Sequence, residues 1–134
     1  MTFYKEKEYR TMAAYIDHAA YQVRDLDWCR RFFHEVFGME EEKSRVSADG
    51  LGQVWFRGGV QLCESRETAV CGQAHHLSLI VDDLEAARRR ALEWGCEADS
   101  RPNWLRMPEG LWLELFQARE GAISALLELP RREN

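Results

Sequence analysis

Two histidines occupy similar apolar stretches that lie 58 positions apart. His18 lies in YIDHAAYQV and His76 lies in AHHLSLIV. A carboxylate, Glu114, and an amide, Gln61, lie in two further apolar stretches, LWLELFQ and VQLCES. Imidazole nitrogens, carboxylate oxygens and amide oxygens are the ligands that a divalent transition metal takes, with positions left open for substrate or water. These four residues are therefore candidate metal ligands, provided that the fold brings them together.

The two histidine stretches each begin a repeated sequence. Shifting the chain by 58 positions aligns HAAYQVRDLDWCRRFFHE with HLSLIVDDLEAARRRALE, and both segments run from a histidine into an Asp-Leu pair and an Arg-Arg pair. In each copy a strand leads into aspartates that can cap a helix by accepting hydrogen bonds from its first amides. Gly38 and Gly95 are then typical helix stops. The sequence therefore predicts the same unit twice.

Three short strand-forming segments follow each predicted helix, and the turns between them include DG, GG and PEG. In the first helix, Leu26, Phe33, Val36 and Phe37 have the spacing of one apolar face. We expect an α+β fold with two βαβββ modules in a single domain of about one hundred residues. The expected boundaries are an N-terminal arm at 1–14, module one at 15–65, a connector at 66–74, module two at 75–117 and a C-terminal tail at 118–134.

Side chains alternate between the two faces of a strand, which separates the polar positions from the apolar ones. On this rule His18 lies with Ala20, His76 with Ser78, Gln61 with Cys63, and Glu114 with Trp112 and Phe116. A buried carboxylate without a partner costs on the order of several kcal/mol, so Glu114 needs a compensating group. If the two halves pack with their non-helical faces together, the four polar residues point into one shared cleft.

At this point the chain resembles the vicinal oxygen chelate superfamily, which includes glyoxalase I, fosfomycin resistance proteins, methylmalonyl-CoA epimerase, extradiol dioxygenases and bleomycin resistance proteins. The resemblance covers residues 15–117 and is carried, in order, by IDHAAYQVRDLDWCRRFFHEVFGME, HHLSLIVDDLEAARRRALEWG and PEGLWLELFQ. It implies that the two modules form an open, cleft-containing β-barrel with helices outside. It also implies that a metal is held by residues on the first and last strands of the modules.

By that resemblance His18, His76 and Glu114 match the commonest ligand positions, and Gln61 matches a fourth position that varies within the superfamily. The resemblance implies one divalent transition metal per chain (Fe, Mn, Ni, Co or Zn) in an enzyme of the lyase, isomerase or dioxygenase type. Glu114 is expected to act as a base as well as a ligand. Because Gln61 is not a carboxylate, a two-glutamate proton shuttle of the glyoxalase kind is not available.

The residues around the expected ligands are candidates for binding a small-molecule substrate. We assign this role to Trp112, Phe116, Arg106 and Cys63, with Arg106 as the residue that would hold an anion. His75 is expected on the face opposite His76, although a one-residue change of register would exchange the two. The alternative function is a non-catalytic binding protein of the bleomycin resistance type, in which the histidines and Glu114 hydrogen-bond one another.

Composition bounds the class of protein. The chain has 134 residues, a formal net charge of −5 and 46% hydrophobic residues, values typical of a globular protein that binds neither nucleic acid nor membranes. Its four cysteines, at 29, 63, 71 and 96, do not form CxxC pairs, so we expect free thiols in the cytoplasm. The apolar tail segment AISALLEL and the habit of the resembled superfamily predict a homodimer.

Overall fold

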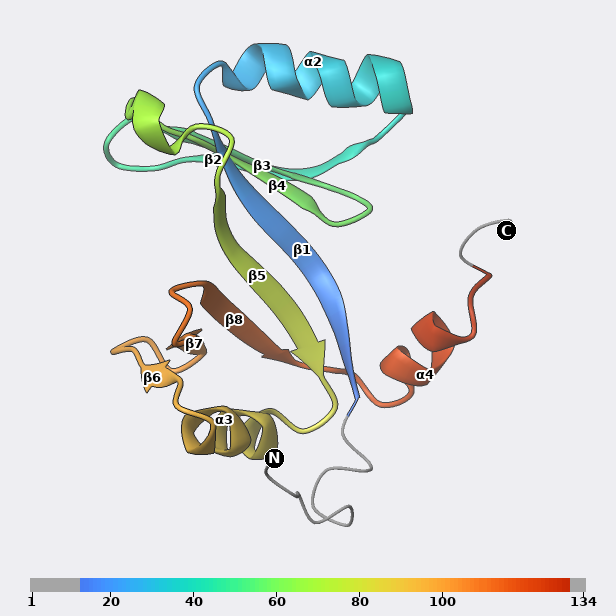
Figure 1. Ribbon diagram of the computed structural model, residues 1–134. Helices are drawn as coiled ribbons and strands as arrows, with labels where there is room; N and C mark the ends of the chain where they lie inside the picture. The colour runs from blue at the N-terminus through green and yellow to red at the C-terminus, as the bar shows by residue number, and fades with distance from the viewer. Residues whose placement is uncertain (1–12, 131–134) are drawn as a thin grey trace.

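The computed structural model describes residues 13–130, so most of the expected N-terminal arm lies outside the described residues. Each half runs strand, helix, strand, strand, strand, as the repeat predicts (Figure 1). The first half contains β1 (Ala14–Val23), α2 (Leu26–Phe37), β2 (Glu41–Val46), β3 (Gly52–Phe56) and β4 (Val60–Glu64). After the short 3-10 helix η1 (Thr68–Val70), the second half contains β5 (Ala74–Val81), α3 (Leu84–Glu93), β6 (Glu97–Ala98), β7 (Trp104–Arg106) and β8 (Trp112–Gln117), and α4 (Ala122–Leu127) follows.

The two halves form one continuous mixed sheet of eight strands in the order β2-β3-β4-β1-β5-β8-β7-β6. Each half pairs its first strand in parallel with its last, β1 with β4 and β5 with β8, and the halves meet where β1 and β5 pair antiparallel. As expected, the non-helical faces of the two halves turn toward one another (Figure 1), and residues of both halves line one shared pocket between them. Within the single sheet the two halves meet at an edge, because the first strand of each module leaves one edge free for backbone hydrogen bonds to its copy. The sheet stays open, as expected for an unclosed barrel.

Figure 1 shows α2 above the strands of the first half and α3 below those of the second half, and both helices begin where the sequence predicts. Asp25 accepts a hydrogen bond from the amide of Trp28 at 3.0 Å, and Asp83 accepts one from the amide of Ala86 at 3.0 Å. These side chains satisfy amides that have no partner within the helix. Gly38 ends α2 with a positive φ of 66°, a conformation that glycine adopts without strain.

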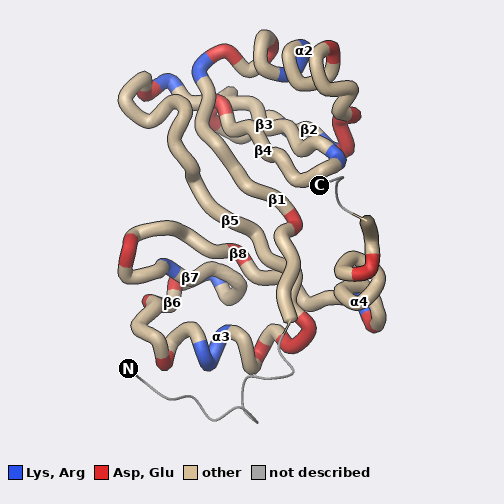
Figure 2. The backbone as a smooth tube through the Cα atoms, turned by 45° about the vertical axis from the view of Figure 1, so that its right-hand side comes forward, with Lys and Arg blue, Asp and Glu red and all other residues tan. Residues whose placement is uncertain are grey.

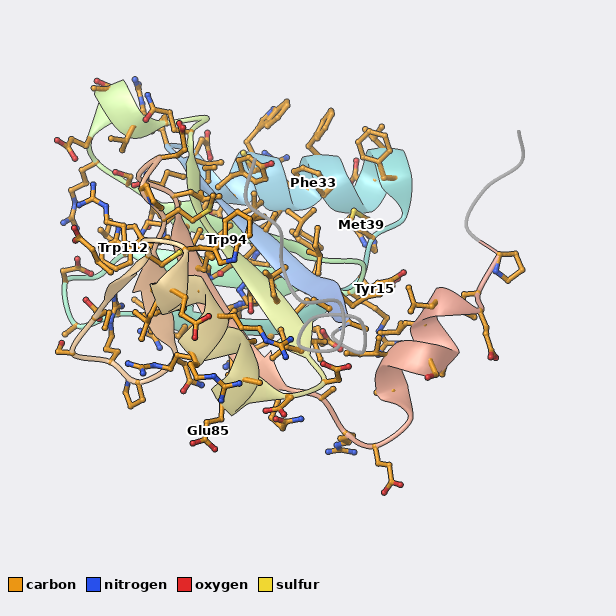
Figure 3. The ribbon with its side chains drawn as sticks, turned by 60° about the horizontal axis from the view of Figure 1, so that its bottom comes forward. Tyr15, Phe33, Met39, Glu85, Trp94 and Trp112 are labelled. Atoms are coloured by element: carbon orange, nitrogen blue, oxygen red, sulfur yellow. The ribbon has the colours of Figure 1, made fainter. Side chains whose placement is uncertain are left out.

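The first half has a compact apolar core beneath α2. Leu26 packs with Val54, Phe56 and Leu62, and Phe33 packs against this cluster. Figure 3 shows Phe33 on α2 and Met39 just beyond the helix, where Met39 also contacts the cluster. Two residues expected on the same helix face, Val36 and Phe37, are 59% and 62% exposed. The buried stripe of α2 is thus narrower than the apolar spacing suggests.

Four polar side chains are also buried within the described residues. They are His18, Gln61, His76 and Ser78, all less than one-tenth exposed. Figure 2 shows acidic and basic positions interspersed over both halves of the described chain. Within residues 13–130, no helix has the length and apolar character needed to cross a membrane, and all four cysteines are free thiols.

Candidate metal centre

Three of the four predicted ligands converge at the seam between the halves. The Nε2 atoms of His18 and His76 are 3.2 Å apart, and Glu114 Oε1 lies 3.6 Å from the first and 3.7 Å from the second. His18 comes from β1, His76 from β5 and Glu114 from β8. Both histidines are buried, at 7% and 5% exposure, and the Glu114 side chain is 20% exposed. The antiparallel pairing of β1 with β5 therefore brings together residues that are far apart in the sequence.

These separations fit a transition metal. Ligand atoms bound at about 2.0–2.1 Å with angles near tetrahedral lie roughly 3.2–3.6 Å from one another. The three observed separations fall in or next to this range, and two imidazoles with one carboxylate form a donor set that leaves positions open. Gln61 supports the same reading, because its side chain is 4% exposed and its Oε1 has no hydrogen-bond partner within the described residues. We refer to His18, His76 and Glu114 as the triad.

Cross-strand register explains how the sheet aligns these groups. Ala20 of β1 lies between Gln61 of β4 and His76 of β5 in one row across the sheet. In the next row Ser78 of β5 lies between His18 and Glu114. Ala20 and Ser78 are fully buried. Their small side chains leave the room that the larger polar groups beside them occupy.

Two irregularities place a second layer of polar groups against the histidines. The β1–β5 register skips Asp17 and also skips His75, so each residue sits in a bulge directly before a triad histidine. Asp17 Oδ2 lies 2.7 Å from His18 Nδ1, and His75 Nδ1 lies 2.7 Å from His76 Nδ1. A bulged residue departs from strict alternation. The prediction that His75 faces away from His76 is therefore wrong, whereas the choice of His76 over His75 as the triad member agrees with the geometry.

The hydrogen bonds fix which nitrogens carry protons. A carboxylate only accepts, so His18 donates from Nδ1 to Asp17 and keeps a lone pair on Nε2. In the metal-free protein His76 Nε2 then donates to His18, and His75 donates to the Nδ1 of His76. The result is a directed chain of hydrogen bonds from His75 to Asp17. Such a chain holds the His18 lone pair toward the triad, as a metal ligand requires. A metal at His76 Nε2 would require the other tautomer, in which His76 donates from Nδ1 to His75.

Burial dominates the electrostatics of the site. Burial and, in decreasing order of importance, the neighbouring His75, His18 and Arg101 together lower the pKa of His76 to about 4. Burial also lowers the pKa of His75. The pKa of Glu114 is raised by burial, against smaller lowering effects of His18, the nearby Ser78 hydroxyl and Arg101. At neutral pH His76 is therefore an uncharged imidazole, the form that binds a metal.

The triad opens into a pocket of about 900 Å³ on the same face of the sheet. Of the residues that the sequence assigns to substrate binding, Phe116 and Cys63 line this pocket, together with Gln61. Burial raises the pKa of the Cys63 thiol to about 11, so it stays protonated at neutral pH. Trp112 and Arg106 do not line the pocket. Arg106 Cζ instead lies 5.5 Å from the centre of the Trp112 ring.

Asp17 and Arg101 are among the polar residues of the pocket that sequence reasoning did not assign to the site. For Asp17 a signal existed, because a polar residue directly precedes the histidine in both copies of the repeat, Asp17 in one and His75 in the other. Arg101 lies in the loop between β6 and β7, where the repeat carries no matching motif. Only the folded arrangement of that loop brings its side chain to the pocket.

Comparisons with known proteins agree with this fold. A family model described as a glyoxalase-like domain matches residues 16–116. The uncharacterized protein YwbC of Bacillus subtilis (strain 168) is 30% identical over 125 residues, covering 79% of this chain and 99% of that protein. Among solved structures, a methylmalonyl-CoA epimerase is similar with a TM-score of 0.58 and 21% identity, over 78% of this chain and 95% of the other.

A mutant of 4-hydroxymandelate synthase from Streptomyces coelicolor is similar with a TM-score of 0.60 and 21% identity, over 78% of this chain and 37% of that one. At these identities the solved structures establish a shared fold. They do not establish a shared activity. The family match extends over most of the described residues, and it agrees with the two βαβββ modules. The chain therefore belongs to the glyoxalase-like domain family of the vicinal oxygen chelate superfamily.

Proposed function

We propose that this protein is a metal-dependent enzyme that acts on a small oxygen-bearing substrate, with one divalent transition metal held by the triad. The observation that carries the proposal is the convergence of two buried imidazoles and one carboxylate, at 3.2 to 3.7 Å, beneath an open pocket. When bound, the metal would act as a Lewis acid that polarises substrate oxygens. The ion is Fe, Mn, Ni, Co or Zn, and Gln61 is a weaker fourth ligand through its unpaired Oε1.

The protein residues have distinct tasks in this proposal. Asp17 orients His18 through Nδ1, which keeps the His18 Nε2 lone pair available. His76 stays neutral because of its low pKa. Glu114 supplies the negative charge and, since burial raises its pKa, its carboxylate also accepts a proton more readily than an exposed glutamate. Glu114 is thus the catalytic base as well as a ligand.

The names of two similar solved structures narrow the type of reaction that we propose. The similar solved structures are named as an epimerase of methylmalonyl-CoA and a synthase of 4-hydroxymandelate. Both named compounds carry a carboxylate and further oxygen atoms, and we extend only this feature to the substrate proposed for the present chain. We therefore propose proton-transfer chemistry of a lyase or isomerase, with an oxygen-dependent reaction of a dioxygenase as the alternative outcome.

An exchange experiment tests the enzyme proposal. Metal-loaded protein is incubated in D₂O with a panel of small 2-oxo acids, 2-hydroxy acids and acyl thioesters, and loss of α-proton signals is followed by NMR. We expect exchange of at least one compound, and we expect Glu114→Gln to abolish it. A parallel oxygen-electrode measurement with Fe²⁺-loaded protein and catechol detects the dioxygenase alternative. Absence of both reactions would reject the catalytic proposal.

One observation favours the alternative of a binding protein without chemistry. The chain of hydrogen bonds from His75 to Asp17 satisfies both triad histidines through protein groups, so the site is not left with unpaired nitrogens. On this alternative, chelator treatment leaves the melting temperature unchanged and zinc binds no more tightly than to a surface site. A rise in melting temperature on adding zinc supports the metal proposal instead.

We also propose a cytoplasmic location, a homodimer and residues 15–117 as the functional unit. Four free thiols are consistent with a reducing compartment.

The proposed dimer surface includes two exposed leucines in and just after α4. Leu127 is 60% exposed and Leu129 is 57% exposed. An exposed apolar segment of this kind suits burial against a second copy of the chain. Analytical ultracentrifugation of the wild type and of a Leu127→Glu variant tests the dimer: loss of dimer in the variant supports this surface.

A further inference from the structure

We propose that Arg101 binds an anionic group of the substrate. The preferred substrates would then carry a carboxylate or similar oxyanion close to the oxygens that chelate the metal. This inference rests on the proposed function, because it places the other end of the substrate on the triad. It replaces Arg106, the anion-binding residue that the sequence suggests, with a residue that lies in the pocket.

The loop that carries Arg101 is held at both ends and in its middle. The backbone of Asp99 donates to the carbonyl of Trp104 at 3.2 Å, and the amide of Trp104 donates to the carbonyl of Arg101 at 3.2 Å. Arg88 of α3 donates to the carbonyl of Pro102, also at 3.2 Å. A proline after Arg101 further restricts its backbone. The arginine therefore starts from a fixed backbone position.

The Arg101 side chain is also oriented before any ligand arrives. Its Nε donates to Asp99 Oδ2 at 2.5 Å, and its Cζ lies 4.3 Å from the centre of the Trp104 ring and 5.7 Å from that of Trp112. Within residues 13–130, no hydrogen bond engages its two terminal nitrogens. These nitrogens form a planar pair of donors that matches the two oxygens of a carboxylate. An arginine held in this way loses little freedom when it binds an anion.

Arg101 lies close enough to the triad for one small molecule to reach both. A single indole separates them, since the Trp104 ring is 4.7 Å from the His76 ring and 4.3 Å from Arg101 Cζ. Arg101 and all three triad members line the same pocket. The positive charge of Arg101 is also one of the causes that lower the pKa values of His75, His76 and Glu114.

The other cations on this face lack one or more of these features. Arg106 faces Trp112 at 5.5 Å but does not line the pocket. Arg45 and Lys43 also line the pocket, yet both are on the edge strand β2, where exposed cations also serve to prevent strand pairing. Lys43 lies 4.8 Å from the Trp55 ring. Its ammonium group cannot form the paired donors of a guanidinium. Among the pocket cations of residues 13–130, Arg101 combines a fixed orientation with a place beside the triad.

A matched pair of chelators tests the inference. Succinate monohydroxamate and its methyl ester carry the same two chelating oxygens and differ in charge at the far end. Their affinities are measured for full-length protein, by calorimetry in the zinc-loaded state and by ligand-observed NMR titration in the metal-free state. The variants are Arg101→Gln, Arg101→Lys, Asp99→Asn and, as the control cation outside the pocket, Arg106→Gln. Circular dichroism checks that each variant is folded.

We expect the wild type to bind the acid about tenfold more tightly than the ester in either state. The ratio should fall to about one in Arg101→Gln, fall partly in Arg101→Lys and Asp99→Asn, and persist in Arg106→Gln. A ratio near one for the wild type in both states overturns the inference. So does a ratio that survives Arg101→Gln or that Arg106→Gln also removes.

The same titrations separate this inference from the proposed function. Zinc binding without any hydroxamate reports on the triad alone. If zinc does not bind but the acid-to-ester ratio still depends on Arg101, the metal centre fails and the anion site stands. If zinc binds and the ratio is near one, the metal centre stands and the anion site fails.

Discussion

The two halves of the sheet place different groups at equivalent positions. His18 and His76 are equivalent residues of the repeat, and in the pairing of β1 with β5 a bulged residue directly precedes each of them. In the first half the bulged residue is Asp17, an anion that accepts a hydrogen bond from its histidine. In the second half it is His75, whose Nδ1 lies 2.7 Å from that of its histidine and which adds to the effect of burial in lowering the pKa of His76. The first half therefore orients a ligand, whereas the second half keeps its ligand uncharged.

The last strands of the halves differ in a similar way. Gln61 lies opposite Ala20, and Glu114 lies opposite Ser78, the equivalent position in the repeat. The first half thus contributes an amide and the second half a carboxylate. Two modules with the same arrangement of strands therefore supply different side chains to one site. One half supplies orientation, and the other supplies negative charge and a group that can accept a proton.

Replacing Glu114 by glutamine makes the two halves alike and should have the largest effect. We expect zinc affinity to fall at least about 100-fold, because the site loses the charge that offsets the metal. Calorimetric titration with a competing chelator measures this change. Gln61→Ala is the matched control in the other half, and about tenfold or less is expected there. Zinc binding by Glu114→Gln within tenfold of the wild type would contradict the assigned asymmetry.

His76 should make the metal-free protein less stable in mild acid. Its pKa is about 4 in the folded state and about 6.5 when exposed, so between these values the unfolded chain binds more protons. Stability is therefore fully present above about pH 6.5 and falls as the pH drops toward 4, by about 2–3 kcal/mol. Glu114, with its raised pKa, acts in the opposite direction and reduces the net change.

Urea unfolding at a series of pH values, in the presence of a chelator, measures this dependence. His76→Gln is expected to flatten the curve between pH 6.5 and 4. A wild-type curve that is already flat there, or a variant with an unchanged slope, would show that His76 is not held neutral by burial.

Asp17→Asn tests the orienting role of the first half and should have a smaller effect. The asparagine side chain fills a similar volume but can present an amide donor to His18 Nδ1, which no longer fixes the tautomer. We expect zinc affinity to fall about tenfold, as for other partners of metal-bound histidines. Unchanged affinity in a folded variant would indicate that the hydrogen bond at 2.7 Å is not needed for ligand orientation.

His75→Gln, at the equivalent position of the second half, should have the smallest effect. Glutamine retains hydrogen bonding but removes a group whose charge lowers the pKa of His76. We expect zinc affinity to change less than about threefold, because no charged partner is lost. The apparent pKa of His76, followed by NMR in metal-free protein, should rise. A loss of affinity larger than that of Asp17→Asn would reverse the assigned roles of the two halves.

Much of this arrangement is predictable from the sequence, because duplication and strand alternation are local signals. The repeat exposes the equivalence of His18 and His76, and the aspartate caps mark where each helix begins. Alternation then places Gln61 and Glu114 on the face away from the helices. These features depend on residues near one another in the chain, and they are found in the structure.

The remaining features depend on long-range pairing. Antiparallel pairing of β1 with β5 decides that the halves join edge to edge, and the two register shifts in that pair bring Asp17 and His75 to the histidines. A bulge has no strong sequence signal when the bulged residue is not glycine. Arg101 reaches the pocket through hydrogen bonds from α3 and β7 to its loop. No periodic pattern in the sequence encodes those contacts.

Anomalous diffraction from crystals soaked in zinc tests the central claim most directly. We predict one strong peak per chain within about 2.0–2.2 Å of Nε2 of His18, Nε2 of His76 and the Glu114 carboxylate. The peak should be absent from Glu114→Gln crystals treated in the same way. Zinc bound only at other residues, with none at these three side chains, would contradict the account.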